Sequence, residues 1–331
     1  MADSELDVVG VGNAIVDVLA PASDQFLEKH GLAKGSMTLI DEARSRELYA
    51  NMGPGREASG GSAANTMAGV ALLGGRPAYI GRVCNDQLGE IFSHDMRSSG
   101  IHFAVPPAAE GPSTARCLIL VTPDGQRTMN TYLGACVNLC PEDVDEDLVR
   151  RGQVLYLEGY LWDKPKAKEA FLKAAKVARA SGRRVALSLS DSFCVNRHRA
   201  SFRDLVDNHV DILFANESEI KALYETDSFD EAARQARSQT SLAALTRGAL
   251  GSVLLTASEQ VEVAAEPIDR VVDTTGAGDL YAAGVLFGLT HGESLADAGR
   301  RGSIAAAEII SHFGARPEQD LRALVAAGLA S

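Results

Sequence analysis

The stretch that decides the fold of this 331-residue sequence reads Asp273-Thr274-Thr275-Gly276-Ala277-Gly278-Asp279. It stands between a β-rich region and an apolar segment that predicts a helix. Close glycines let the backbone approach an anion, and the N–H groups at a helix start attract one. An aspartate there can take a proton from a substrate hydroxyl while the amides hold a phosphoryl group. The residues alone equally fit a glycine turn in which Asp279 is only a first-turn charge.

From about residue 154 onward, apolar runs typical of strands alternate with helical patterns, and the C-terminal third is helical. Strands are expected at 154–160, 184–190, 211–215 and 242–247, a helix at 164–180, a hairpin at 253–264, and helices at 277–290, 294–312 and 318–329. This alternation predicts a three-layer α/β/α fold with a mostly parallel central sheet.

The N-terminal half departs from simple alternation. Residues 8–17 are expected to form one buried strand with a polar tip, and residues 62–73 a helix. A hairpin around Pro123-Asp124-Gly125 has no helix after it and should leave the main sheet. We therefore expect one domain over 1–331, with a small β-sheet lid built from segments near 19–45 and 101–130.

Composition narrows the class of protein. The formal charge of -12 argues against non-specific binding to nucleic acid or to an anionic membrane. Five cysteines without a C-x-x-C pair support neither a zinc site nor a disulfide framework, and reduced thiols predict a cytoplasmic protein. No basic and apolar leader precedes Val8, so no signal peptide is expected.

Two further motifs accompany the first one in order along the chain. One runs from Gly60-Gly61-Ser62-Ala63-Ala64-Asn65 to Asp86-Gln87-Leu88-Gly89, and the other is Asn216-Glu217-Ser218-Glu219. Together with residues 273–279 they resemble the motifs of the ribokinase-like (PfkB) carbohydrate kinase family. The resemblance covers residues 8–317 and implies an ATP-dependent phosphotransferase with the ribokinase-like fold.

The resemblance implies roles for the phosphate-binding and catalytic residues. Asp279 would be the base, and the amides around Gly276, Ala277 and Gly278 would form an anion hole. Asn216 and Glu219 would organise Mg²⁺ through water, although a helix cap explains the same pair. The remaining nucleotide contacts implied by the family are Asn216, Thr246, Gly248, Gly251 and Thr275.

The resemblance also implies an acceptor site. Asp17 and Asn13 would bind sugar hydroxyls, since a carboxylate can accept two vicinal O–H bonds, and polar residues at a strand end are the plainer alternative. Contacts from the glycine-rich motif and from an apolar or aromatic wall complete the expected site: Gly60, Gly61, Asn65, Leu133, Tyr160 and Phe193. Phe193 would stack on a purine, whereas ordinary packing explains Leu133 and Tyr160 as well.

The family's adenosine kinase branch is the most similar one, which favours adenosine as acceptor and AMP as product. Asp191 stands where a small apolar residue is usual in the eukaryotic-type enzymes, so a sugar kinase of the ribokinase or fructokinase kind stays open. Gly10-x-Gly12 leaves an NAD-binding oxidoreductase as a distant alternative.

The remaining expectations concern cofactors, partners and one arginine. ATP and Mg²⁺ are implied, with a monovalent cation such as K⁺ as a possible addition. The expected partners are small-molecule substrates, and the expected assembly is a monomer or a homodimer. Arg127, on the lid hairpin, could reach the phosphates, although a solvated surface arginine is the more ordinary interpretation.

Overall fold

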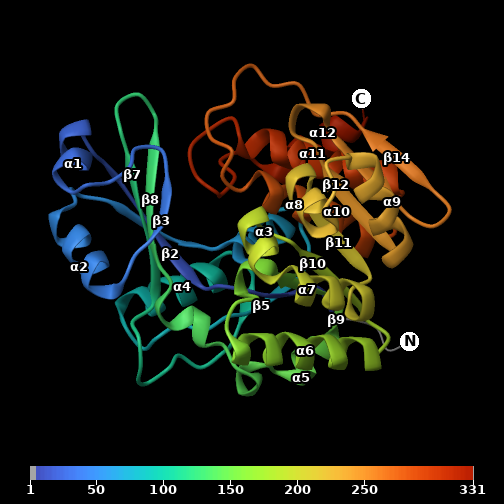
Figure 1. Ribbon diagram of the computed structural model, residues 1–331, viewed down its shortest axis with the longest axis horizontal. Helices are drawn as coiled ribbons and strands as arrows, with labels where there is room; N and C mark the ends of the chain where they lie inside the picture. Colours follow the sequence, from blue (N-terminus) through green and yellow to red (C-terminus); the bar gives the residue numbers. More distant parts are fainter. Residues whose placement is uncertain (1–4, 331) are drawn as a thin grey trace.

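The computed structural model describes residues 5–330, and within that range the strands form two separate sheets (Figure 1). The larger sheet runs in the order β14 (Gln260–Val263), β13 (Ser252–Leu255), β12 (Leu242–Thr246), β11 (Ile212–Asn216), β10 (Arg184–Ser188), β9 (Gly152–Glu158), β1 (Leu6–Val11), β5 (Pro77–Ile80) and β6 (His102–Phe103). The strands from β12 to β6 are parallel, and β13 and β14 extend one edge as antiparallel strands.

Helices cover both faces of this sheet, as an α/β order requires. One layer contains α3 (Ser62–Leu72), α10 (Ala277–Thr290), α11 (Leu295–Ile309) and α12 (Leu321–Ala330). The other contains α5 (Glu146–Arg151), α6 (Pro165–Ala180), α7 (Ser192–His209), α8 (Glu217–Tyr224) and α9 (Phe229–Gln239). The three-layer architecture predicted from the sequence is confirmed.

The smaller sheet stands beside the body, at the left of Figure 1. Its order is β3 (Met37–Leu39), β8 (Arg127–Tyr132), β7 (Ala115–Val121), β2 (Ile15–Pro21) and β4 (Arg56–Gly60). Helices α1 (Asp24–Lys29) and α2 (Glu42–Asn51) connect its strands, and α4 (Gln87–Ser98) contacts β2 and β4. The β7–β8 hairpin leaves the main sheet, as its turn sequence predicted.

The strands of the two sheets differ in how far they are exposed to solvent. Every residue of β1 is buried, as expected for a parallel strand covered on both faces. In β2 buried and half-buried residues alternate, so one face packs inward and the other stays partly open. Asp17 belongs to the open face, together with Ile15 and Leu19.

Three sequence-based expectations about these elements were wrong. Residues 8–17 are not one strand, because the chain leaves β1 at Gly12 and enters β2 of the other sheet. The bounds of the lid segments were partly wrong: segments 19–45 and 101–130 do contain β3, β7 and most of β8 of the small sheet, but residues 24–29 are helical, β6 joins the large sheet, and β4 was not foreseen. A strand, not a helix, follows Gly10-x-Gly12, which removes the dinucleotide-binding alternative.

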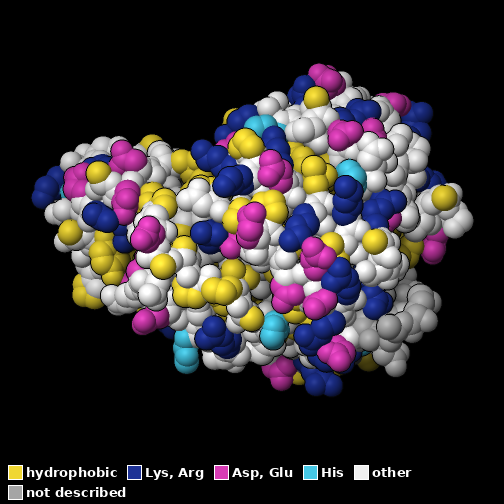
Figure 2. All heavy atoms as spheres, turned by 90° about the horizontal axis from the view of Figure 1, so that it is seen from below, with side chains coloured by type: hydrophobic (Ala, Val, Ile, Leu, Met, Phe, Trp, Pro, Cys, Tyr) yellow, Lys and Arg dark blue, Asp and Glu magenta, His cyan; other side chains and the backbone are white. Residues whose placement is uncertain are grey.

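Figure 2 shows the smaller lobe joined to the larger body, with acidic and basic side chains interspersed over the face in view. None of the helices within residues 5–330 combines the length and the apolar character needed to cross a bilayer.

The contact between α3 and α10 is close enough to be tested. A Cβ built on Gly69 of α3 would lie 2.6 Å from Ala283 Cβ and 2.8 Å from Leu280 Cδ1, both in α10. We expect Gly69→Ala to lower the free energy of unfolding by about 1–3 kcal/mol, because overpacking forces the helices apart. Gly53→Ala is the control, since its Cβ would meet nothing within 4 Å. Equal denaturant midpoints for the two variants would contradict the prediction.

Candidate active site

Polar residues at the ends of five strands lie at one edge of the large sheet. Asn13 follows β1, Glu158 ends β9, Asp191 follows β10, Asn216 ends β11, and Thr246 ends β12. These strands are parallel, so their carboxyl ends share one edge, where open α/β sheets bind ligands.

The segment 273–279 forms a turn and then the start of α10. Asp273 Oδ1 accepts hydrogen bonds from Thr275 N at 3.0 Å and from Thr275 Oγ1 at 2.8 Å. Gly276 is the N-cap of α10 with φ +82°, a conformation that glycine adopts without strain. Gly278 is exposed, and a Cβ built there would meet nothing within 4 Å. A helix N-terminus therefore faces open space beside Asp279.

One amide of the expected anion hole is already engaged. Ala277 N donates to Thr274 O at 3.2 Å, which closes the turn before the helix. The positive end of the α10 dipole remains in place. The anion hole as a whole stays a prediction.

The side chain of Asp279 is held by α3. Its Oδ1 accepts from Ser62 Oγ at 2.6 Å, and its Oδ2 accepts from Asn65 Nδ2 at 3.0 Å. Burial raises the pKa of Asp279, while the bonds from Ser62 and Asn65 and the charge of Arg316 oppose that rise. The structure thus joins the first and last sequence motifs at one carboxylate.

Asp17 lies on the open face of β2, within electrostatic reach of Asp279. Burial raises the pKa of Asp17 to about 6; Arg316 and Arg127 oppose the rise, and Asp279 adds to it. Gly60 leaves room for this carboxylate, because a Cβ there would lie 2.4 Å from Asp17 Oδ2. Gly61, with φ +96°, has equally little space, since its Cβ would lie 2.2 Å from Asn13 O.

Glu158 is a site residue that the sequence reasoning missed. It is 1% exposed, and its carboxylate accepts from Asn13 Nδ2 at 2.7 Å, Asn13 N at 3.3 Å and Ala63 N at 2.8 Å. Burial raises its pKa to about 7, against the lowering effect of those donors. An acidic residue at the carboxyl end of an apolar strand run was the signal that could have revealed it.

Arg316 is a second missed residue, contributed by the loop between α11 and α12. Its guanidinium donates to Ser59 O, Ser59 Oγ and Ala64 O at 3.0–3.3 Å. Arg316 therefore binds the chain on both sides of the Gly60–Gly61 turn. Its charge lowers the pKa of Asp17 and opposes the rise of that of Asp279.

Arg127 is buried, so its interpretation as a solvated surface residue was wrong. Its Nη1 lies 2.5 Å from Asp273 Oδ2, and its guanidinium lies 5.4 Å from the ring centre of Phe313. Its Nε and Nη2 have no hydrogen-bond partner among residues 5–330. The small sheet therefore brings two unpaired donors to the loop that begins at Asp273.

Asn216 and Glu219 form the helix cap that the sequence allowed. Asn216 Oδ1 accepts from Glu219 N at 2.9 Å, and the Glu219 carboxylate accepts from Asn216 N at 2.9 Å and Asn216 Nδ2 at 2.6 Å. Burial raises the pKa of Glu219 to about 7, and the charges of Asp191 and Asp279 contribute.

A metal cage is not part of this arrangement. Within residues 5–330 there is no cluster of three or more His, Cys, Asp or Glu side chains that could hold a metal ion. The partly negative surroundings of Glu219 do fit Mg²⁺, which keeps several waters and needs only one or two carboxylates besides substrate phosphates.

The loop after β12 begins beside Asn216, because Thr246, the last residue of β12, is paired with Asn216 of β11 in the parallel sheet. Gly248 has φ +57°, and Gly251 has φ +84° with Val263 O only 2.1 Å from where a Cβ would be. The chain forms a short 3₁₀ turn here, Gly248–Leu250, and both glycines take left-handed backbone conformations.

The expected aromatic wall is exposed. Phe193, at the start of α7, is 80% exposed and Tyr160 is 43% exposed. Partial burial of the Tyr160 hydroxyl raises its pKa, and the charge of Asp191 adds to the rise. Leu133 is half-buried after β8, and its role stays a prediction.

Asp191 caps α7 by accepting from Phe193 N at 2.6 Å. Ser190, just before it, has φ +67°, a left-handed conformation that costs a non-glycine residue energy. Such strain is frequent at functional sites, and here it directs Asp191 and Phe193 from the end of β10.

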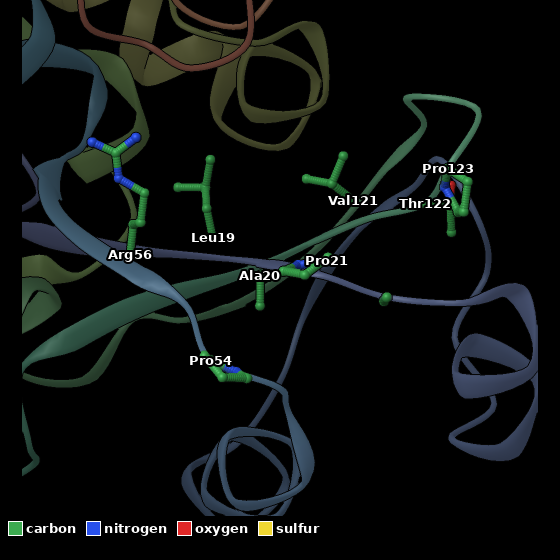
Figure 3. A pocket seen from close by; sticks show the side chains of 9 residues that line it. Leu19, Ala20, Pro21, Pro54, Arg56, Val121, Thr122 and Pro123 are labelled. Atoms are coloured by element: carbon green, nitrogen blue, oxygen red, sulfur yellow. The ribbon is translucent and has the colours of Figure 1, made fainter.

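A cavity of about 450 Å³ lies farther along the small sheet. Leu19, Val121 and Arg56 project from one side of the strands, while Ala20 points away (Figure 3). Leu19 shares the face of Asp17, so the open face continues from the carboxylate into an apolar surface.

Comparison with known proteins identifies the family to which this chain is similar. Residues 27–321 match the family model of the pfkB family carbohydrate kinases. Adenosine kinase from Sinorhizobium meliloti is 53% identical over 99% of this chain and 100% of its own, with a TM-score of 0.90. A probable sugar kinase from Rhizobium etli is 51% identical over 98% and 99%, also with 0.90. Adenosine kinase from Saccharomyces cerevisiae is 27% identical over 87% of this chain and 90% of its own.

The raised pKa of Glu158 predicts how stability depends on pH. Between pH 5 and 8 the folded state binds a proton that the unfolded chain releases, so the free energy of unfolding falls as pH rises. From pH 5 to 8 this single group should remove roughly 2–3 kcal/mol. Denaturant titrations of the wild type and Glu158→Gln should show the steeper decline in the wild type. Parallel curves would contradict the assignment.

Proposed function

Because this chain belongs to the pfkB family of carbohydrate kinases, we propose that it transfers the γ-phosphoryl group of ATP to the 5′-hydroxyl of a nucleoside. Adenosine is the proposed acceptor and AMP the product. The observation that carries the proposal is the Asp279 carboxylate, held by Ser62 and Asn65 beside a helix N-terminus.

Asp279 is the proposed base. Its raised pKa favours uptake of a proton, and the bonds from Ser62 and Asn65 fix its orientation. The acceptor O–H bond breaks as Asp279 takes the proton, the oxygen bonds to the γ-phosphorus, and the bond to ADP breaks in line. The N-terminus of α10 stabilises the phosphoryl oxygens.

Asp17, Asn13 and Asn65 are the proposed sugar-binding residues. Asn13 Oδ1 and Asn65 Oδ1 are buried and have no partner among the described residues. With the Asp17 carboxylate they form a set of hydrogen-bond acceptors, and sugar hydroxyls supply the matching donors. Gly60 and Gly61 keep the space around them open.

Two features support a nucleoside over a free sugar. The exposed rings of Phe193 and Tyr160 offer stacking surfaces for a flat base. The face of the small sheet beyond Asp17 is apolar, with Leu19 and Val121 projecting from it (Figure 3). A sugar kinase is the second candidate, favoured by Asp191 at the same edge and by the similarity to the Rhizobium etli protein.

The proposed nucleotide site lies between the ends of the adjacent strands β11 and β12 and the turn that precedes α10. Its proposed residues are Asn216, Thr246, Gly248, Gly251 and Thr275, with Arg127 directing its unpaired donors to the phosphates. Glu219 and Asn216 would hold Mg²⁺ through water, and the ion would neutralise developing phosphate charge.

The small sheet is the proposed lid, whose closure would exclude water as a competing acceptor. K⁺ dependence and a monomeric or homodimeric assembly stay predictions.

An acceptor screen tests the proposal. ATP consumption should be measured with adenosine, guanosine, inosine, ribose and fructose, against a control without acceptor that reports hydrolysis by water. We expect the highest kcat/KM with adenosine. Turnover of ribose or fructose without turnover of any nucleoside would contradict the proposal and favour the sugar kinase.

A further inference from the structure

Glu158 reaches the candidate acceptor site through Asn13. The side chain of Asn13 is 2% exposed, and its Nδ2 donates to Glu158 Oε1 at 2.7 Å. The backbone N–H of Asn13 donates to the same oxygen at 3.3 Å. One carboxylate oxygen therefore holds both the chain and the amide of this residue.

The second oxygen of Glu158 completes a helix cap. Gly61, the N-cap of α3, has no side chain with which to accept from the first N–H groups of the helix. Glu158 Oε2 accepts from Ala63 N at 2.8 Å in its place. Gly12 allows this approach, because a Cβ there would lie 2.4 Å from Glu158 Oε2. The carboxylate is thus fixed from two sides.

The Glu158 carboxylate decides which way the Asn13 amide points. An ionised carboxylate only accepts, so the NH₂ group of Asn13 must face it. The amide oxygen is then turned away, and Asn13 Oδ1 is buried without a partner among residues 5–330. A buried acceptor without a partner is costly, which indicates that a ligand donor belongs there.

The neighbouring Asn65 is oriented in the same way. Its Nδ2 faces the Asp279 carboxylate at 3.0 Å, and its Oδ1 is left unpaired. Two carboxylates thus engage the NH₂ groups of two amides and leave both amide oxygens buried without a partner among residues 5–330. Asp279 has a catalytic task of its own in the proposed function, whereas Glu158 touches only Asn13 and the start of α3 in the interactions above.

We propose that Glu158 is a positioning residue that sets the hydroxyl selectivity of the acceptor site. By holding the Asn13 amide with its oxygen toward the ligand, Glu158 makes the site select an acceptor hydroxyl that donates a hydrogen bond. This inference rests on the proposed function, since it assumes that Asn13 contacts the acceptor.

Replacement of an acceptor hydroxyl by fluorine removes its ability to donate a hydrogen bond while the size of the group stays nearly the same. A C–F group can only accept, so an oxygen at Asn13 rejects it, whereas a reversed amide with NH₂ toward the ligand tolerates it. In Glu158→Gln the side-chain amide can donate to Asn13 Oδ1, which permits that reversal. Adenosine should be compared with its 2′-fluoro-2′-deoxy and 3′-fluoro-3′-deoxy analogues. The pH should be 8, so that Glu158 is ionised.

The expected result is a change in a ratio, the kcat/KM for adenosine divided by that for the fluoro analogue. Asn13→Ala identifies the position at which this ratio depends on Asn13. At that position Glu158→Gln should lower the ratio by about tenfold or more, because the fluoro analogue no longer leaves a buried polar group unpaired. Glu308→Gln is the matched control, because Glu308 is another buried carboxylate that accepts from backbone N–H groups, those of Glu318 and Gln319. Its ratio should equal that of the wild type.

Unchanged ratios at both positions in Glu158→Gln would overturn the proposal, as would an equal change in Glu308→Gln. If Glu158→Gln does not fold, Asn13→Ala decides alone, and wild-type ratios at both positions in that variant would overturn it. If the wild type does not phosphorylate adenosine, the proposed function fails separately. The same ratios are then measured with the sugar that the acceptor screen identifies and its fluoro-deoxy analogues.

Discussion

The rest of the site depends on the bonds that Ser62 and Asn65 make to the carboxylate of Asp279. They join the first turn of α3 to the first turn of α10, two helices that lie far apart in the sequence. Close packing at Gly69 brings the helix bodies together. Because both N-termini then point to the same edge of the sheet, one carboxylate, one dipole and the Gly60–Gly61 turn occupy a single small volume.

This arrangement concentrates negative charge in a protein that already carries a formal charge of -12. Burial raises the pKa values of Asp17, Glu158 and Glu219 into the range of about 6–7. Arg316 and Arg127 counter this by lowering the pKa of Asp17. The two arginines come from different segments, Arg316 from the loop between α11 and α12 and Arg127 from β8 of the small sheet. The carboxylate of Asp17 therefore lies within electrostatic reach of two cationic side chains.

Much of the fold and part of the site could be predicted from the sequence. The alternation after residue 150 predicted the parallel sheet, and the three motifs singled out Asp279 as a candidate base, whereas its hydrogen bonds with Ser62 and Asn65 became known only from the structure. The break between β1 and β2 was missed, although the apolar pattern changes there from continuous to alternating, which marks a change from a covered to a half-open strand. Glu158 was missed although it stands at the carboxyl end of an apolar strand run, whereas the roles of Arg316 and Arg127 could not be assigned because they come from burial and from contacts between distant segments. A lone charged residue carries no such signal in the sequence.

In the proposed reaction Asp279, held by Ser62 and Asn65, is the base for phosphoryl transfer. The most direct test is the turnover of Asp279→Ala at saturating acceptor and ATP, with nucleotide affinity measured on the same preparation. The account predicts that kcat falls by at least about 10²–10⁴-fold while ATP still binds, because the proton acceptor is lost and the nucleotide site is kept. Near-normal turnover by the variant would contradict it.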